Sequence, residues 1–127
     1  RQRMGDAKAT KDEIAQITTL MAKKGTFIQG AGKLAALIKS SYTSSDESIR
    51  AELFAASKRA AHLLRCRYTA VGFWRAGRDV FQAAVDAAQE EDRKKAAEEW
   101  LALAKVEVGA CEEADAATTA KAAPSPA

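Results

Sequence analysis

RCRYTAVGFWRAGRDVF, residues 65–81, is the point in the chain at which two helical patterns meet. It holds four of the nine arginines, four of the eight aromatic residues and two glycines, Gly72 and Gly77. An unbroken helix over residues 46–90 would be roughly 65 Å long, which is too long for a domain of this size. We therefore predict a corner between about residues 70 and 78.

Amphipathic patterns lie on both sides of this corner. An apolar stripe starts at Ile49, after the polar loop SSYTSSDES and its capping-box pattern Ser44–Glu47. A third helix is predicted over 80–88 and a fourth from Asp92 onward. Ahead of the loop, the capping-box pattern that begins at Thr10 predicts one helix of about 11–39. That helix has a local irregularity at KKGT, where the alternative is a helix end and a second start at Thr26.

The composition indicates an all-α protein. The chain has 127 residues, is 47% hydrophobic with much alanine, and has two prolines, both among its last four residues. Four amphipathic helices joined by short links predict an antiparallel up-down four-helix bundle. We expect a mobile basic arm over 1–9, a helical domain over 10–114, and a disordered tail rich in alanine and proline over 115–127.

Charge is unevenly distributed along the chain. Residues 1–78 carry 15 Lys and Arg against 6 Asp and Glu, whereas residues 79–127 carry 5 against 11. This division predicts either internal pairing or a polarised surface that meets a partner. Glu90 with Lys94, and Glu91 with Lys95, have the spacing of favourable helix pairs. No run of 18 apolar residues exists, so the sequence predicts no transmembrane segment.

No motif predicts catalysis, a cofactor or a metal site. The segment GTFIQGAGKLA lacks the spacing of a phosphate-binding loop, and we expect its glycines to allow close approach of a neighbouring helix. His62 and Cys66 lie one helical turn apart, but nothing completes a metal site. Cys66 and Cys111 are expected to be small buried residues, with a disulfide between them as the alternative. The sequence therefore predicts that the protein is not an enzyme.

The corner holds the candidate binding residues, which combine arginine with aromatic side chains. The predicted set is Arg65, Arg67, Tyr68, Trp74, Arg75 and Arg78. Arginine and tryptophan are enriched at protein interfaces, which favours docking on acidic groups of a larger assembly with an aromatic anchor. The same residue types also stack on bases, so a small RNA- or ribosome-associated protein is the alternative. A third interpretation is that the aromatic rings fill the core and that the arginines pair within the protein.

The segment VFQAAVDAAQEEDRKKAAEEWLALAKVEV, residues 80–108, resembles the last two helices of the PsbQ-type extrinsic subunits of photosystem II. The likeness lies in an alanine-rich helix, a short charged turn and a second helix rich in alanine and lysine. The two cysteines and the aromatic corner depart from that family. The resemblance implies a non-catalytic accessory subunit in the chloroplast thylakoid lumen that docks on a membrane complex.

Overall fold

The computed structural model is helical along the part of the chain that it describes, which comprises the backbone of residues 2–43 and 45–122 and the side chains of residues 9–43 and 45–110. The predicted all-α class is confirmed. The described elements are helix α1 (Gln2–Met21), the 3-10 turn η1 (Lys24–Thr26), and helices α2 (Phe27–Ser41), α3 (Glu47–Cys66), α4 (Val71–Ala87) and α5 (Glu91–Ala122).

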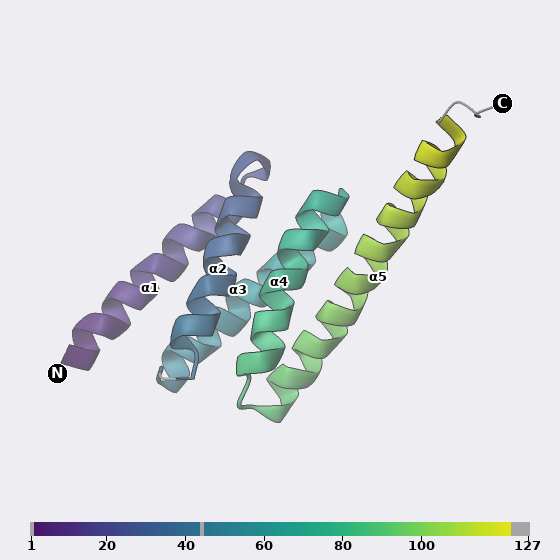
Figure 1. Ribbon diagram of the computed structural model, residues 1–127. Helices are drawn as coiled ribbons and strands as arrows, with labels where there is room; N and C mark the ends of the chain where they lie inside the picture. Colours follow the sequence, from purple (N-terminus) through teal and green to yellow (C-terminus); the bar gives the residue numbers. More distant parts are fainter. Residues whose placement is uncertain (1, 44, 123–127) are drawn as a thin grey trace.

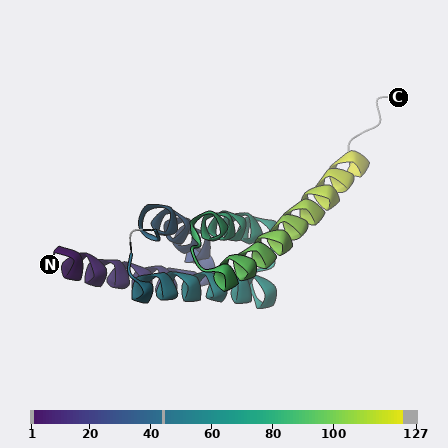
Figure 2. The same cartoon turned by 90° about the horizontal axis from the view of Figure 1, so that it is seen from below.

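Consecutive helices run in opposite directions (Figure 1). Helices α2 and α4 lie side by side in one layer, and α1 and α3 lie in the other (Figure 2). Helix α5 packs along α4, and its C-terminal half extends away from the other helices. All four links between helices therefore lie at two ends of the molecule, with the α1–α2 and α3–α4 links at one end.

The core is built from large side chains at the centre and small residues where helices come close. Phe27, Leu53 and Phe81 are fully buried, and so are several alanines. A side chain at Gly77 would place its Cβ 2.3 Å from Leu64 Cδ1. Helices α3 and α4 therefore approach each other at a point where only glycine fits without rearrangement.

The number of helices differs from the prediction, because the described residues form five helices where the sequence predicted four. The segment expected to form one helix over 11–39 ends at Met21, and a new helix starts at Phe27. The Thr26 hydroxyl donates a hydrogen bond to the Leu20 carbonyl at 2.6 Å. A Cβ at Gly30 would lie 2.8 Å from Met21 Cγ. The chain folds back at this turn because α2 packs tightly on the end of α1, and the alternative of a second start at Thr26 is confirmed.

The outer helix ends also differ from the prediction. Helix α1 begins at Gln2, so residues 2–9, expected to be a mobile arm, form its first turns. Helix α5 continues to Ala122 through residues expected to belong to a disordered tail. Alanine and lysine occur in both segments, with arginine and methionine also in the first, and these residues favour helix. The remaining arm residue, Arg1, and tail residues 123–127 lie outside the described part.

The predicted corner lies earlier in the chain than expected. Helix α3 ends at Cys66 and α4 begins at Val71, so Gly72 and Gly77 belong to α4 rather than to the link. Two helix starts are also displaced. Asp46 caps α3 by accepting a hydrogen bond from the Ile49 backbone N–H at 3.0 Å. Helix α5 includes Asp92 in its first turn instead of being capped by it.

Candidate functional site

An aromatic cluster joins the α1–α2 link to the α3–α4 link. The ring of Phe27 lies 5.0 Å from the ring of Tyr68 and 5.7 Å from that of Phe73, measured between centroids. The Tyr68 hydroxyl donates a hydrogen bond to the Ala22 carbonyl at 2.9 Å. Apolar packing and one directional hydrogen bond thus fix the two links relative to each other.

The two aromatic residues that the sequence proposed as anchors are buried. Tyr68 is 6% exposed and Trp74 is 4% exposed. Both belong to the core cluster, where their rings fill the space between helices. The burial of Trp74 follows from its place on the inward face of α4, three residues before the close approach of Gly77 to α3.

The arginines of the predicted set divide between two places. Arg65 and Arg67 are exposed at the C-terminal end of α3. Arg75 is exposed and Arg78 is half-buried on α4, which lies in the other layer. Two of the four arginines thus lie at the end of α3 and just after it, and two lie on α4.

Two lysines that the sequence reasoning missed lie at the same end as Arg65 and Arg67. Lys23 and Lys24 are exposed in the α1–α2 link, directly after Ala22, which accepts the hydrogen bond from Tyr68. We refer to Lys23, Lys24, Arg65 and Arg67 as the basic end. Residues 22–26 and 65–70 contain no acidic residue. The lysine pair in KKGT was the available signal, but only the fold brings it to the link between α3 and α4.

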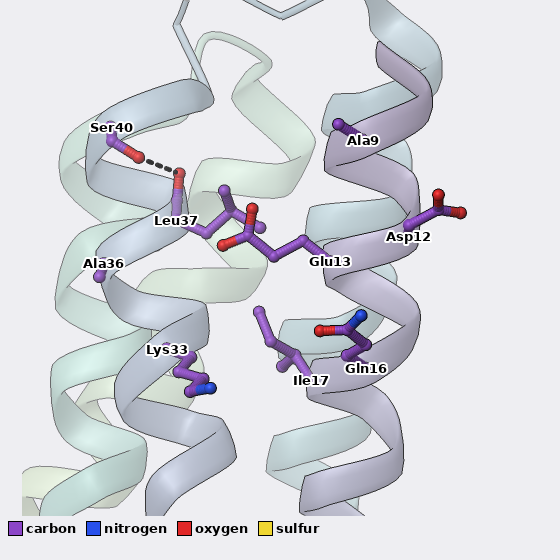
Figure 3. A pocket seen from close by; sticks show the side chains of 9 residues that line it. All are labelled: Ala9, Asp12, Glu13, Gln16, Ile17, Lys33, Ala36, Leu37 and Ser40. Atoms are coloured by element: carbon purple, nitrogen blue, oxygen red, sulfur yellow. Dashed lines mark hydrogen bonds between the residues drawn. The ribbon is translucent and has the colours of Figure 1, made fainter. Parts of the chain in front are cut away.

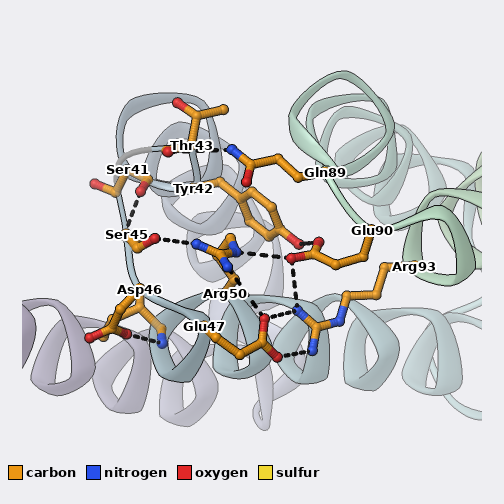
Figure 4. Close-up of polar contacts among 11 residues, drawn as sticks. Ser41, Tyr42, Thr43, Ser45, Asp46, Glu47, Arg50, Gln89, Glu90 and Arg93 are labelled. Carbon is orange, nitrogen blue, oxygen red and sulfur yellow. Dashed lines mark hydrogen bonds and ion pairs between the residues drawn. The ribbon is translucent and has the colours of Figure 1, made fainter.

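The opposite end of the molecule holds a network of charged residues from three segments (Figure 4). We refer to Tyr42, Glu47, Arg50, Glu90 and Arg93 as the polar end. The Tyr42 hydroxyl donates to Glu90 Oε1 at 2.5 Å, and Arg50 Nε donates to Glu90 Oε2 at 2.9 Å. Arg93 forms a bidentate pair with Glu47, with N–O distances of 3.1 Å and 2.5 Å. These contacts fasten the α4–α5 link to the start of α3.

The polar end shifts the pKa values of its members. Burial, together with the hydrogen bond to Glu90, raises the pKa of Tyr42 to about 12. Burial acts to raise the pKa of Glu90, but hydrogen bonds from Tyr42 and Arg50 outweigh it and lower that pKa below its ordinary value. The hydrogen bonds to Glu47 raise the pKa of the Arg93 guanidinium. All three pKa shifts keep Tyr42 neutral, Glu90 ionised and Arg93 protonated at neutral pH, which are the states that these hydrogen bonds require.

Glu90 therefore has different partners from those the sequence predicted. The spacing favoured Lys94, whereas Glu90 contacts Arg50 at 2.9 Å and Arg93 at 3.5 Å. Glu90 lies just before α5, and its carboxylate contacts an arginine of α3 as well as one in the first turn of α5. Internal pairing, one of the two interpretations of the charge pattern, thus involves Arg50 and Arg93.

An open groove lies between α1 and α2 (Figure 3). Its volume is about 720 Å³, and Ile17 and Leu37 form its floor. Asp12 and Glu13 of α1 line one side, and Lys33 of α2 lines the other. Ala9 and Ala36, which have small side chains, also line the groove. It is a shallow surface with exposed charges of both signs, which is poorly suited to enclosing a small molecule.

The cysteine prediction is corrected for one of the two residues. Cys66 is a free, exposed thiol, and its sulfur lies 3.9 Å from His62 Nδ1. It is exposed because it falls on the outer side of the last turn of α3. The side chain of Cys111 lies outside the described part. Within the described residues, no group of three His, Cys, Asp or Glu side chains is placed to hold a metal ion.

A comparison with curated proteins gives a partial relative. No family model matches the chain. No solved structure matches it. The E3 ubiquitin-protein ligase AIP2 of Arabidopsis thaliana is 32% identical to it over 95 residues. The match covers 75% of this chain and 31% of the ligase, so the chain spans about a third of the length of that relative.

Within the described residues, no helix is long and apolar enough to cross a membrane.

Proposed function

We propose that the chain is a non-catalytic helical docking module that binds an acidic surface of a protein partner through the basic end. The observation that carries this proposal is that four exposed cations, in the α1–α2 link and at the end of α3, lie beside a fixed platform. The rings of Phe27, Tyr68 and Phe73 and the hydrogen bond from Tyr68 to Ala22 hold that platform. A preorganised cluster of one sign attracts the opposite charge with little further ordering.

The partial match to a ubiquitin ligase is compatible with a docking role. A chain that matches about a third of a larger protein fits a part that works beside other parts. We infer that the matched part supports recruitment or assembly in such a protein rather than its chemistry. The accessory role in a photosynthetic assembly, the thylakoid-lumen location and the resemblance to PsbQ-type subunits stay predictions.

The burial of the aromatic residues favours a protein partner over RNA. Proteins that bind single-stranded RNA place exposed rings against the bases. Here Tyr68 and Trp74 are core residues, and Phe73 is partly buried against them. The basic end therefore offers charge without a stacking surface. Binding to RNA is the alternative outcome of the experiment below.

The test compares two double charge reversals of equal size. Arg65→Glu with Arg67→Glu inverts the basic end, whereas Lys94→Glu with Lys95→Glu makes the same change on exposed residues at the start of α5. We expect proteins captured by the intact chain to be lost with the first variant, with binding weakened at least about tenfold, and retained with the second. Equal capture by both variants would contradict the proposal. Tight binding of a single-stranded RNA probe at low salt, lost in the first variant, would favour the alternative.

A further inference from the structure

The exposed side of α3 carries a row of basic side chains along its C-terminal half. Lys58, His62 and Arg65 follow one another at intervals of four and three residues, which places them on one face of the helix. Arg59, next to Lys58, is exposed on the same side. We refer to these four residues as the basic stripe. Arg65 also belongs to the basic end, so the two surfaces are continuous.

The charges of the basic stripe are not neutralised within the described residues. Residues 14–45 and 53–78 contain no acidic residue, and these ranges include the C-terminal halves of α1 and α3, two helices that pack on each other. None of the lysine and arginine side chains of the stripe forms an ion pair with a described side chain. In the first half of α3, by contrast, Glu52 pairs with Lys11 of α1 at 3.5 Å. Internal pairing therefore accounts for charges in the first half of this helix but not for those of the stripe.

The position of the basic stripe within its helix does not explain it either. Cations in the last turn of a helix are favoured by the partial negative charge at its C-terminus, and Arg65 has this position. Lys58 and Arg59 lie about two turns before the end at Cys66, beyond the range of that effect. No described helix covers the outer side of the layer that α1 and α3 form (Figure 2). The stripe is therefore open to a partner.

The surroundings of the basic stripe disfavour a membrane and a long polyanion. Among the described side chains, the large hydrophobic ones that are exposed are Ile28 of α2 and Val106 of α5, so the stripe has no such group to insert into a bilayer. The row from Lys58 to Arg65 is about 10 Å long. A nucleic acid strand that follows α3 beyond this row meets the carboxylate of Glu52 in place of further cations. The occupant therefore carries its negative charge over a short length.

We propose that the basic stripe binds an acidic helix of the protein partner, with the two helices side by side. Carboxylates at intervals of three and four residues over two turns of a helix repeat at the same distances as Lys58, His62 and Arg65, so they can meet all three at once. Exposed Ala55 precedes Arg59 by one turn, and its small side chain lets the partner helix approach closely. This inference rests on the proposed docking function and names the kind of surface that the module recognises.

The first measurement is the binding of two synthetic peptides to the full chain by fluorescence anisotropy. One peptide carries four glutamates on one face of an alanine-based helix, and the other carries the same residues with the glutamates spread around the helix. Both have equal helicity by circular dichroism. Because single exposed ion pairs are weak, the chain is titrated from about 1 µM to 1 mM. We expect the one-faced peptide to bind at least about tenfold more tightly. Equal binding of the two peptides, or binding of neither, would overturn the proposal.

The second measurement reverses the charges of the basic stripe outside the basic end. Lys58→Glu with Arg59→Glu changes two exposed side chains to a residue that favours helix, so this variant should fold. It should weaken binding of the one-faced peptide at least about tenfold, whereas Lys94→Glu with Lys95→Glu should leave it unchanged. Equal effects of the two reversals would contradict the proposal. It would also be overturned if a single-stranded RNA or phosphatidylserine vesicles bound to the stripe and the peptide did not.

The same variant separates this inference from the docking function on which it rests. Capture of protein partners should be lost with both Arg65→Glu, Arg67→Glu and Lys58→Glu, Arg59→Glu. Loss with the first pair alone would leave docking at the basic end in place and overturn the role of the stripe. Retention of the captured proteins with both pairs would contradict the docking function itself.

Cys66 provides a native reporter for the place of binding. Its thiol is exposed, and its sulfur lies 3.9 Å from His62 Nδ1, beside the basic stripe. In a Cys111→Ser chain it is the only thiol, and saturating one-faced peptide should slow its alkylation by iodoacetamide several-fold. Adding Lys58→Glu and Arg59→Glu should remove this protection. An unchanged alkylation rate at saturating peptide would show that the peptide binds elsewhere and would overturn the proposal.

Discussion

The two ends of the molecule join pairs of helix links by different physical means. At the basic end, Tyr68 crosses from the α3–α4 link and donates to Ala22, inside a cluster of three aromatic rings. At the polar end, Tyr42 at the close of α2 donates to Glu90 in the α4–α5 link, inside a network of charged groups. A tyrosine makes the connection in both places, but rings surround one hydroxyl and ions surround the other.

This difference determines what each end leaves available at the surface. The aromatic cluster is held by contacts between uncharged groups. The four cations of the basic end take no part in these contacts and are exposed to solvent. The polar end uses its arginines internally, since the side chains of Arg50 and Arg93 are 19% and 17% exposed and pair with Glu90 and Glu47. Similar residue types thus stay exposed at one end and fasten α5 at the other.

The substitution expected to lower the free energy of unfolding most is Phe27→Ala, beside the basic end. Phe27 is fully buried and contacts both other rings of the cluster, so the substitution removes its burial and leaves a cavity. Such changes lower the free energy of unfolding by about 3–5 kcal/mol. Phe54→Ala is the comparison at the other end of the molecule, where the ring is half-buried against Trp100 and Arg93. Urea unfolding should show a clearly smaller loss for Phe54→Ala, and equal losses would contradict the central role given to Phe27.

Glu90→Gln tests the polar end and has a smaller, pH-dependent effect. At pH 7 it weakens the contacts to Arg50 and Tyr42, and we expect the free energy of unfolding to fall by about 1–3 kcal/mol. The lowered pKa of Glu90 means that its carboxylate stabilises the fold above the ordinary value of 4.5, and that this contribution is lost as the pH falls below it. The difference between the original chain and the variant should therefore shrink between pH 5 and pH 2 in thermal unfolding experiments. A difference that stays constant with pH would show that the charge of Glu90 contributes nothing.

The sequence predicts the helices better than it predicts what their side chains contact. The all-α class and the stripe that begins at Ile49 follow from the 3.6-residue periodicity, because burial of one helix face is a local pattern. The extra helix break was harder to predict, because an apolar stripe continues across KKGT. What ends α1 is the packing of Gly30 on Met21, which brings together residues from two helices.

The candidate site shows the same limit at the level of single residues. The sequence pointed to Arg65 and Arg67 because these arginines lie beside aromatic residues in the chain. It did not point to Lys23, because Lys23 belongs to the α1–α2 link, more than 40 residues before Arg65 in the sequence. From the sequence alone, Trp74 could lie either in the core or at the surface. In the folded protein it lies in the core. The spacing offered Glu90 a partner at Lys94, but its side chain pairs with Arg50 of α3 and with Arg93. Local spacing identifies possible pairs, and tertiary packing selects among them.

The smallest effect, that of Tyr68→Phe, isolates the one directional contact at the basic end. The substitution keeps the ring between Phe27 and Phe73 and removes the hydroxyl that donates to Ala22, so the free energy of unfolding should fall by about 0.5–1.5 kcal/mol. The loss should lack the acid dependence of Glu90→Gln, since the acceptor is a backbone carbonyl and not a carboxylate. Because the hydroxyl ties the lysine-bearing link to α3, hydrogen exchange of the amides near Ala22 should also become faster. An unchanged exchange rate there would mean that the rings alone hold the two links together, and that the four cations of the basic end owe their arrangement to packing.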